Sequence, residues 1–477
     1  MNGFPRTLLP IASLSCLFLL GGCLDNRMPR LDRNVPTHWR HAAAATPARP
    51  PVDLHDWWKA FHDPQLEQLV DQALKHNPDV AIATEHLRAA RALYGTRMAQ
   101  LRPQLQLRTD NPIDPDATSS YFLIGFDASW ELGLFGRGQA VDRVASGRYR
   151  EAVENLRAVR VSLVAEVVRN VIQLRAAQRQ EHLLDAIVKV RERQVELLRT
   201  RARLELSDRA DLAAAQAELA QAQAALSGPR IDADHAAQRL ALLLGRNEPQ
   251  PAWLQPAPLP QLGPHGPVVA PAELLRTRPG IALAEARVIE AAGHLGIARA
   301  DLYPHIGLGA SLVWSLNINR YRRHGGAGES NDIGTAGPLI SVPLFDWGLR
   351  QSRKHAQGHL LKAAVLAYRK AVLTGVTEVE TALGSLTQLR QREAASEAAC
   401  ASWKQSADLQ RTRRRLGLAS DLDSADIHIG QARAQMALTD ARMQRDMAYI
   451  ALYKALGGAP PLPARDDSTA TAQAGKP

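Results

Sequence analysis

The feature that most constrains the fold is an internal duplication. Pro78 and Pro103 bracket a helical pattern in the first half, and Pro279 and Pro304 bracket the same pattern 201 residues further on. Later in the halves the offset becomes 212, and the matched residues are Gly136 with Gly348, Asp211 with Asp423, and Gly245 with Gly457. A repeat of this length predicts two structural units built on one plan.

Each repeat reads as a helix, a β-hairpin, a long helix, a polar turn and a returning helix. The predicted ranges are 66–248 and 272–460 for the repeats, about 104–130 and 305–343 for the hairpins, and about 205–211 and 417–423 for the turns. The long helices, at about 139–204 and 349–416, would each span on the order of 100 Å at the rise of an α-helix. The returning helices begin near Asp211 and Asp423 and end at the glycines of a helix C-cap.

The hairpins alternate with a period of two. Phe122, Ile124 and Phe126 fall on one face of the first hairpin, whereas Gly125 and Asp127 fall on the other. Segments of about 10 residues with this alternation are typical of transmembrane β-strands, although half-buried soluble hairpins share the pattern. Two hairpins cannot close a barrel, and open strand edges are not tolerated in lipid. We therefore expect subunits to pool their strands, about 12 in a trimer.

The N-terminus predicts export and lipid anchoring. Residues 1–22 carry an apolar stretch that ends in Leu20-Gly21-Gly22-Cys23, which resembles a bacterial lipobox. Cys23 would then carry palmitate or similar acyl chains, unless the site is an ordinary secretory cleavage site. Leu24 follows in place of the aspartate that tends to retain lipoproteins at the inner membrane, so the outer membrane is the expected location.

The composition narrows the class of protein. Aromatic residues make up 5% of the 477 residues, and alanine and leucine recur throughout, which favours long helices. No other run of about 20 apolar residues exists, which excludes a polytopic helical membrane protein. The net charge is +10, but the arginines are spread along helices and the chain is exported, so no nucleic-acid partner is expected.

Nothing in the sequence predicts an enzyme. The histidines form no HExxH pair, and Gly325-Gly326-Ala327-Gly328 lacks the lysine and hydroxyl residue of a phosphate loop. The three cysteines have no zinc spacing, so we expect no catalytic residue, metal or cofactor.

Three motifs resemble one known family. They are Trp57-Trp58-Lys59-Ala60-Phe61-His62-Asp63-Pro64, Trp130-Glu131-Leu132-Gly133-Leu134-Phe135-Gly136-Arg137 and Val342-Pro343-Leu344-Phe345-Asp346-Trp347-Gly348. Together they are similar to the TolC-type outer-membrane efflux proteins, and closest to the lipoprotein branch found in drug-efflux systems of the resistance-nodulation-division type. The likeness runs from Trp57 to Ala459.

The resemblance implies a mainly α-helical fold with a transmembrane β part. A homotrimer would form a β-barrel of about 12 strands, continued by a periplasmic α-barrel of about 12 helices. Residues 23–65 would form the lipid-anchored tether and the start of an equatorial region, 249–271 a proline-rich connector in that region, and 461–477 a disordered tail.

The implied function is that of a passive exit duct for drugs or other small toxic molecules. Its partners would be a periplasmic adaptor (membrane fusion) protein, an inner-membrane efflux pump and outer-membrane lipid. Two alternatives stay open: a type I secretion duct, and a lipid-anchored periplasmic coiled-coil scaffold without a pore. The alternating hairpins favour a duct, because a scaffold needs no lipid-facing strands.

The second turn carries the candidate gate. Leu422 and Asp426 are four residues apart and so share a helix face. In the resembled family a leucine and an aspartate at the positions of Leu422 and Asp426 constrict the periplasmic mouth, and we count Asp423 as a third gate candidate. Threefold symmetry would bring the leucines into a ring that excludes water and the carboxylates into a ring that attracts cations.

The remaining tip residues have two interpretations. As adaptor contacts or gate locks we single out the following: Asp208, Asp211, Gly417, Ser420, Asp421, Arg414 and Arg415. As plain helix ends, Ser420 with Asp423 reads as a capping box, Asp208 with Asp211 as an analogous cap, and the arginines as a solvated C-terminus. Compared with the family, Gly133 stands at a usual aspartate and Glu205 at a tip glycine, so the first turn is expected to differ locally.

Overall fold

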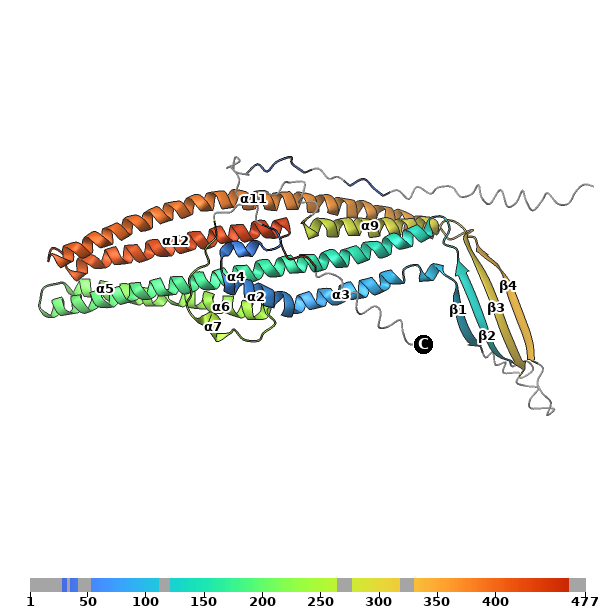
Figure 1. Cartoon of the computed structure of the whole chain (residues 1–477), viewed down its shortest axis with the longest axis horizontal. Coiled ribbons are helices and arrows are strands. Elements are labelled where there is room, and N and C mark those ends of the chain that lie inside the picture. The colour runs from blue at the N-terminus through green and yellow to red at the C-terminus, as the bar shows by residue number, and fades with distance from the viewer. Residues whose placement is uncertain are drawn as a thin grey trace, which may run out of the picture. The chain divides into compact units, whose positions relative to one another are not determined.

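Two helices of 67 residues each dominate the chain, α4 (Arg137–Arg203) and α11 (Leu349–Arg415). Figure 1 shows the computed structural model, which describes residues 28–31, 35–41, 53–110, 121–263, 277–317 and 330–462. The predicted long helices are confirmed to within two residues at each end. The chain divides into two compact units: unit 1 is Met1–Asp32, His86–Val153 and Leu283–Lys370, and unit 2 is Arg33–Glu85, Glu154–Ala282 and Ala371–Pro477.

Unit 1 contains one antiparallel sheet of four strands in the order β1-β2-β3-β4 (Figure 1). The strands are β1 (Gln104–Asp110), β2 (Tyr121–Glu131), β3 (His305–Asn317) and β4 (Ser330–Ser341). The first hairpin thus pairs with the second through β2 and β3, while β1 and β4 form the two edges of the sheet.

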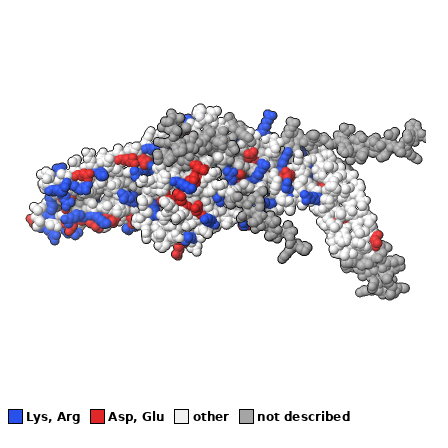
Figure 2. All heavy atoms as spheres, viewed as in Figure 1, with Lys and Arg blue, Asp and Glu red and all other residues white. Residues whose placement is uncertain are grey.

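The two faces of the sheet differ in chemistry. Cross-strand partners such as Leu107 and Phe126, or Trp130 and Leu308, lie on one face, and all four are exposed. The opposite face is mixed: Ser311 Oγ donates a hydrogen bond of 2.7 Å to Asp127 Oδ1 there, and Val313, Ile333 and Leu339 lie on the same face. Figure 2 accordingly shows few charged side chains over the strands. The face that carries Phe126, Trp130 and Leu308 therefore suits an apolar surrounding.

The registers of the two hairpins are equivalent. Gln104 is paired with Ser129 in the first hairpin, and His305 with Ser341 in the second. Adding the repeat offset of 201 to Gln104 gives His305, and adding 212 to Ser129 gives Ser341. The duplication read from the sequence therefore holds residue by residue through the strands.

Helices from both repeats pack closely in unit 1, where α9 (Pro279–Ala300) contacts α4. A Cβ added at Gly147 would lie 2.7 Å from the backbone nitrogen of Glu290, so only glycine permits this approach. Ion pairs flank the contact, at 2.8 Å between Arg148 Nε and Glu290 Oε1 and 2.8 Å between Arg287 Nε and Glu151 Oε1. The helix α3 (Pro78–Gly95) occupies the corresponding place in the first repeat.

Unit 2 contains α12 (Asp421–Leu456), which lies between α4 and α11 (Figure 1). Trp57 of the short helix η1 (Trp57–Phe61) stacks on Tyr453 with ring centroids 5.4 Å apart, and its Nε1 donates to the carbonyl of Gly458. Two further short elements belong to this unit, α2 (Pro64–His76) and α7 (Pro251–Leu254). Arg175 of α4 holds both, since its guanidinium donates to Gln65 of α2 and to the carbonyl of Trp253 in α7.

The first returning helix differs from the expected continuous helix. It is divided into α5 (Arg209–Ala225) and α6 (Ser227–Leu243), whereas α12 runs unbroken. Pro229 explains the division, because proline lacks the backbone N–H and its ring clashes with the carbonyl four residues earlier. The second repeat has no proline in the corresponding stretch.

Several predicted segments lie outside the described residues. They are the signal peptide 1–22, Cys23, much of the tether, residues 264–271 of the connector and 463–477 of the tail. None of the described helices combines the length and the apolar character needed to span a membrane.

Candidate gate at the helix tips

The two turns at the helix tips have the same backbone geometry. Glu205 and Gly417 follow α4 and α11 with φ angles of 57° and 73°, both in the left-handed region. The next residue donates back in each turn, Leu206 N–H to the Arg201 carbonyl (2.8 Å) and Leu418 N–H to the Arg413 carbonyl (2.9 Å). These are Schellman caps. The expectation that Glu205 would change the first turn is wrong, because the turn keeps its shape and glutamate adopts the strained conformation.

This strain predicts that Glu205→Gly stabilises the protein. Glycine adopts positive φ without the Cβ clash that costs a glutamate roughly 1–2 kcal/mol, and its greater freedom in the unfolded chain offsets part of the gain. We expect a net gain of up to about 1 kcal/mol in unfolding free energy. Chemical unfolding in detergent measures the effect. The matched control is Gly417→Ala, which should lose stability, and a loss in both variants would contradict the shared geometry.

The second turn is fixed by a capping box at the start of α12. Ser420 N–H donates to Asp423 Oδ2 (2.8 Å), and Asp423 N–H donates to Ser420 Oγ (3.3 Å). The Asp423 carboxylate also accepts from Ser420 Oγ (2.7 Å). Its hydrogen bonds from the Ser420 backbone and hydroxyl, with the nearby Arg413 and Arg201, hold its pKa below the usual range. In the first turn Asp208 caps α5 by accepting from Ala210 N–H (3.2 Å). Asp423 and Asp208 therefore have a structural role at these helix starts.

Asp421 joins three helices. Its Oδ1 lies 2.6 Å from Arg414 Nη2 of α11, and its Oδ2 lies 3.7 Å from Arg193 Nη2 of α4. Arg193 also pairs with Glu196 at 2.7 Å. The side chain of Arg415, in contrast, is exposed and donates to Thr412. The carboxylate of Asp421 thus bridges the tips of the two repeats.

Leu422 and Asp426 lie on the first turns of α12, as the sequence predicts. Leu422 is half-buried and Asp426 is exposed, while Ser424 and Ala425 between them are buried. The repeat offset of 212 places alanines, Ala210 and Ala214, at the same two positions of the first tip. Only the second tip can therefore present a leucine and a carboxylate on this face.

The contact of Arg193 with Asp421 was not anticipated. Arg193 belongs to no motif and is one of many arginines on α4, so only the pairing of α4 with α12 singles it out. The same pairing creates an apolar cluster between the repeats, made of Ile187, Ile429 and Ala432 with Leu184, Val190, Ala222 and Met436. Figure 2 shows many charged side chains on the surface toward this end of unit 2.

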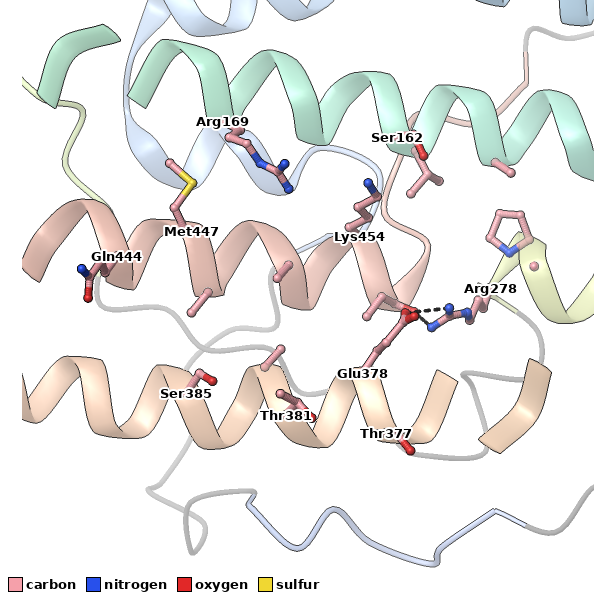
Figure 3. A pocket seen from close by; sticks show the side chains of 18 of the residues that line it. Ser162, Arg169, Arg278, Thr377, Glu378, Thr381, Ser385, Gln444, Met447 and Lys454 are labelled. Carbon is pink, nitrogen blue, oxygen red and sulfur yellow. Dashed lines mark hydrogen bonds and ion pairs between the residues drawn. The ribbon is translucent and has the colours of Figure 1, made fainter. Parts of the chain in front are cut away.

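A groove of about 890 Å³ in unit 2 is lined by α4, α11 and α12 and by Arg278, Pro279 and Gly280 (Figure 3). Its lining contains one carboxylate, Glu378, which pairs with Arg278 at 2.7 Å. It contains no histidine or cysteine, and nine of its nineteen lining residues are alanine, serine or threonine.

One buried carboxylate lies farther along α12. The Asp446 side chain is 0% exposed, and its Oδ1 accepts from Arg445 Nη2 (2.7 Å). Its Oδ2 has no hydrogen-bond partner within the part of the chain that the structure describes. Burial raises the pKa of Asp446 to about 7, against the opposing charge of Arg445 and Arg442, and Glu393 raises it further. Among the described residues no cluster of histidine, cysteine and carboxylate side chains is arranged to hold a metal ion.

Comparison with known proteins identifies a family. The sequence model described as "Outer membrane efflux protein" matches residues 69–246 and 270–458. The chain is 29% identical to the pyoverdine export outer membrane protein OpmQ of Pseudomonas aeruginosa, over 94% of this chain and 96% of the relative. It is 28% identical to the outer membrane protein OprJ of the same organism, over 94% and 95%.

Solved structures agree with the sequence comparison. The outer-membrane channel OprN superposes with a TM-score of 0.79 at 28% identity, covering 91% of this chain and 99% of that one. The open-state MtrE channel of Neisseria gonorrhoeae superposes with a TM-score of 0.75 at 26% identity, covering 91% and 97%. The likeness therefore extends over both repeats.

Proposed function

Because the chain belongs to the outer membrane efflux protein family, we propose that it is the passive exit duct of a tripartite efflux system. Three copies form the duct, a periplasmic adaptor docks on its helix tips, and an inner-membrane pump supplies the energy. The cargo consists of drugs or other small toxic molecules, since relatives include toluene and antibiotic efflux proteins of Pseudomonas putida.

Family membership establishes the location, the general function and the fold class. Its members are outer-membrane efflux channels with large periplasmic parts, and they are not enzymes. The present chain shares the mostly helical fold with few strands of these channels.

The single observation that carries the proposal is the sheet of unit 1. It is one layer, its apolar face is exposed, and its outer strands β1 and β4 have free edges. In lipid every backbone N–H and C=O needs a partner within the protein, so such edges have to be paired. Three copies joined edge to edge supply about 12 strands, a number found in membrane barrels.

The sequence supplies the lipid anchor and the division of the chain into segments in this proposal. Cys23 is lipidated after removal of residues 1–22, and residues 23–65 form a tether that leads to the equatorial region. The repeats 66–248 and 272–460, joined by the connector 249–271, form the two halves of the subunit, and 461–477 is the tail. The acyl chains add an anchor in outer-membrane lipid.

The gate in this proposal is Leu422 with Asp426. Both side chains lie on the same face at the start of α12, where threefold symmetry gathers three copies around the axis. The ion pairs of Asp421 with Arg193 and Arg414 support the closed arrangement, because they link α12 to α4 and α11. Opening then requires these helices to separate when the adaptor docks.

The adaptor contacts the exposed turns. The surface comprises Asp208, Asp211, Gly417, Ser420, Arg414, Arg415 and the partly exposed Asp421. Asp208 and Ser420 cap helices within it, so they shape the turns that the adaptor meets.

Conductance measurements test the proposal. The full-length lipoprotein, purified in detergent, is added to one side of a planar bilayer. A duct gives discrete current steps that become larger when the gate residues are removed. A periplasmic scaffold without a pore gives no steps at any protein concentration, and this outcome would overturn the proposal.

A further inference from the structure

An aromatic contact joins the two repeats within the chain. Phe135, in the link from β2 to α4, stacks on Tyr303 at the end of α9, with ring centroids 5.1 Å apart and planes 16° apart. The contact lies beside the paired strands β2 and β3. It therefore marks where the first repeat docks on the second.

Because the chain is duplicated, Phe135 and Tyr303 each have an equivalent residue in the other repeat. The offset of 212 takes Phe135 to Trp347, and their φ angles agree at 52° and 55°. The offset of 201 takes Tyr303 to Arg102, each directly before the proline that precedes a strand. Trp347 of the second repeat and Arg102 of the first repeat are therefore the equivalents of the stacked pair. The contact between Phe135 and Tyr303 uses neither of them.

Both side chains are exposed in the single chain, and the Trp347 ring contacts that of its neighbour Phe345, with centroids 4.7 Å apart. Trp347 is 90% exposed, and its neighbours Leu344 and Phe345 are 90% and 75% exposed. Arg102 is exposed as well. An exposed apolar group of this kind marks a contact surface for another protein or for lipid.

We infer that Trp347 of one copy stacks on Arg102 of the next copy, as Phe135 stacks on Tyr303 inside the chain. The inference rests on the proposed trimer and names the residues that join its subunits. A planar guanidinium lies well on an indole face, where cation–π attraction adds to the contact. The second repeat of one copy then contacts the first repeat of the next copy. This contact has the same arrangement as the one between the two repeats within a chain.

The same two offsets predict how β4 of one copy pairs with β1 of the next copy. Ser129 of β2 pairs with Gly309 of β3 within the chain. Applying the two offsets takes Ser129 to Ser341 on β4 and Gly309 to Arg108 on β1. The transfer is justified because the hairpin registers are equivalent under these offsets. Ser341 therefore pairs with Arg108 of the next copy, and the free edges of the sheet close on each other.

Thiol crosslinking tests both pairings in the outer membrane. The background variant is Cys400→Ala, and the test variants add Arg102→Cys with Trp347→Cys, or Arg108→Cys with Ser341→Cys. A short thiol-specific crosslinker should convert most of each test variant into covalent dimers and trimers on denaturing gels. The matched control, Phe135→Cys with Tyr303→Cys, should crosslink within one chain and leave its mass unchanged.

The oligomeric state in detergent separates the inference from the proposed function. A trimer whose cysteine pairs crosslink between chains supports both. A trimer without crosslinks at 102–347 and 108–341 overturns the inference and leaves the proposed function standing, for example if Trp347 faces lipid. A monomer overturns both.

A rescue variant tests the stacking itself. Arg102→Tyr recreates the aromatic platform of Tyr303. The temperature at which this variant trimer dissociates into subunits should equal or exceed that of the wild type. Arg102→Ala removes the platform and should lower this melting temperature. Equal melting of all three proteins would show that Arg102 takes no part in the interface.

Discussion

Replacing Leu422 and Asp426 together by alanine raises the single-channel conductance of the purified protein in planar bilayers severalfold. The variant gives α12 the alanines that Ala210 and Ala214 place at the same positions of the first repeat. It removes three leucines and three carboxylates from the proposed mouth of the trimer. Because conductance is limited by the narrowest part of a pore, widening that part alone increases the current.

The cation selectivity of the channel should fall in the same variant. A ring of carboxylates attracts cations, so its removal weakens their preference over anions. The matched control is Ile231→Ala with Asp234→Ala, which removes the same types of side chain from an exposed part of α6. Unchanged conductance in the gate variant, or an equal rise in the control, would remove Leu422 and Asp426 from the gate.

Replacing Asp446 by asparagine stabilises the protein at neutral and higher pH but not in acid. The pKa of this carboxyl is raised from 3.8 to about 7 in the folded protein by burial. Below pH 3.8 the Asp446 carboxyl is protonated in both the folded and the unfolded protein, so the wild type has its full stability. As the pH rises toward 7 the unfolded state loses the proton first, so the wild type is progressively destabilised. The difference approaches ~4 kcal/mol above pH 7, at about 1.4 kcal/mol per pKa unit.

Thermal melting of the detergent-solubilised protein between pH 4 and pH 8 measures this effect. The melting temperature of Asp446→Asn should match the wild type at pH 4 and exceed it increasingly up to pH 8. Asparagine keeps an oxygen for Arg445, so the hydrogen bond to that residue survives. Asp440→Asn serves as the control, since Asp440 forms a partly exposed pair with Arg392 worth under about 1 kcal/mol. A pH-independent difference for Asp446→Asn would contradict the raised pKa.

The sequence predicted those parts of the fold that depend on periodicity and repetition. The offsets between Pro78 and Pro279 and between Gly136 and Gly348 predicted two equivalent halves, and the hairpin registers match under these offsets. The alternation around Phe126 indicated strands with one apolar face, and the sheet has this face. Patterns of this kind are strong because burial of one face acts on every second residue of a strand or every turn of a helix.

Other features depend on contacts that no local pattern records. The bridge from Asp421 to Arg193 joins residues more than two hundred positions apart, and Asp446 is buried only because tertiary packing covers it. The left-handed conformation of Glu205 was also missed, since glutamate is rarely found there. In each case the surrounding structure overrides the local preference of the residue.

The central claim is that one chain has too few strands to close a barrel and borrows the rest from identical chains. The mass of the detergent-solubilised lipoprotein, measured by light scattering with the detergent contribution subtracted, tests this claim most directly. We predict a protein mass of three chains, in a complex that dissociates only when the protein unfolds. A stable, folded particle with the mass of one chain would contradict it.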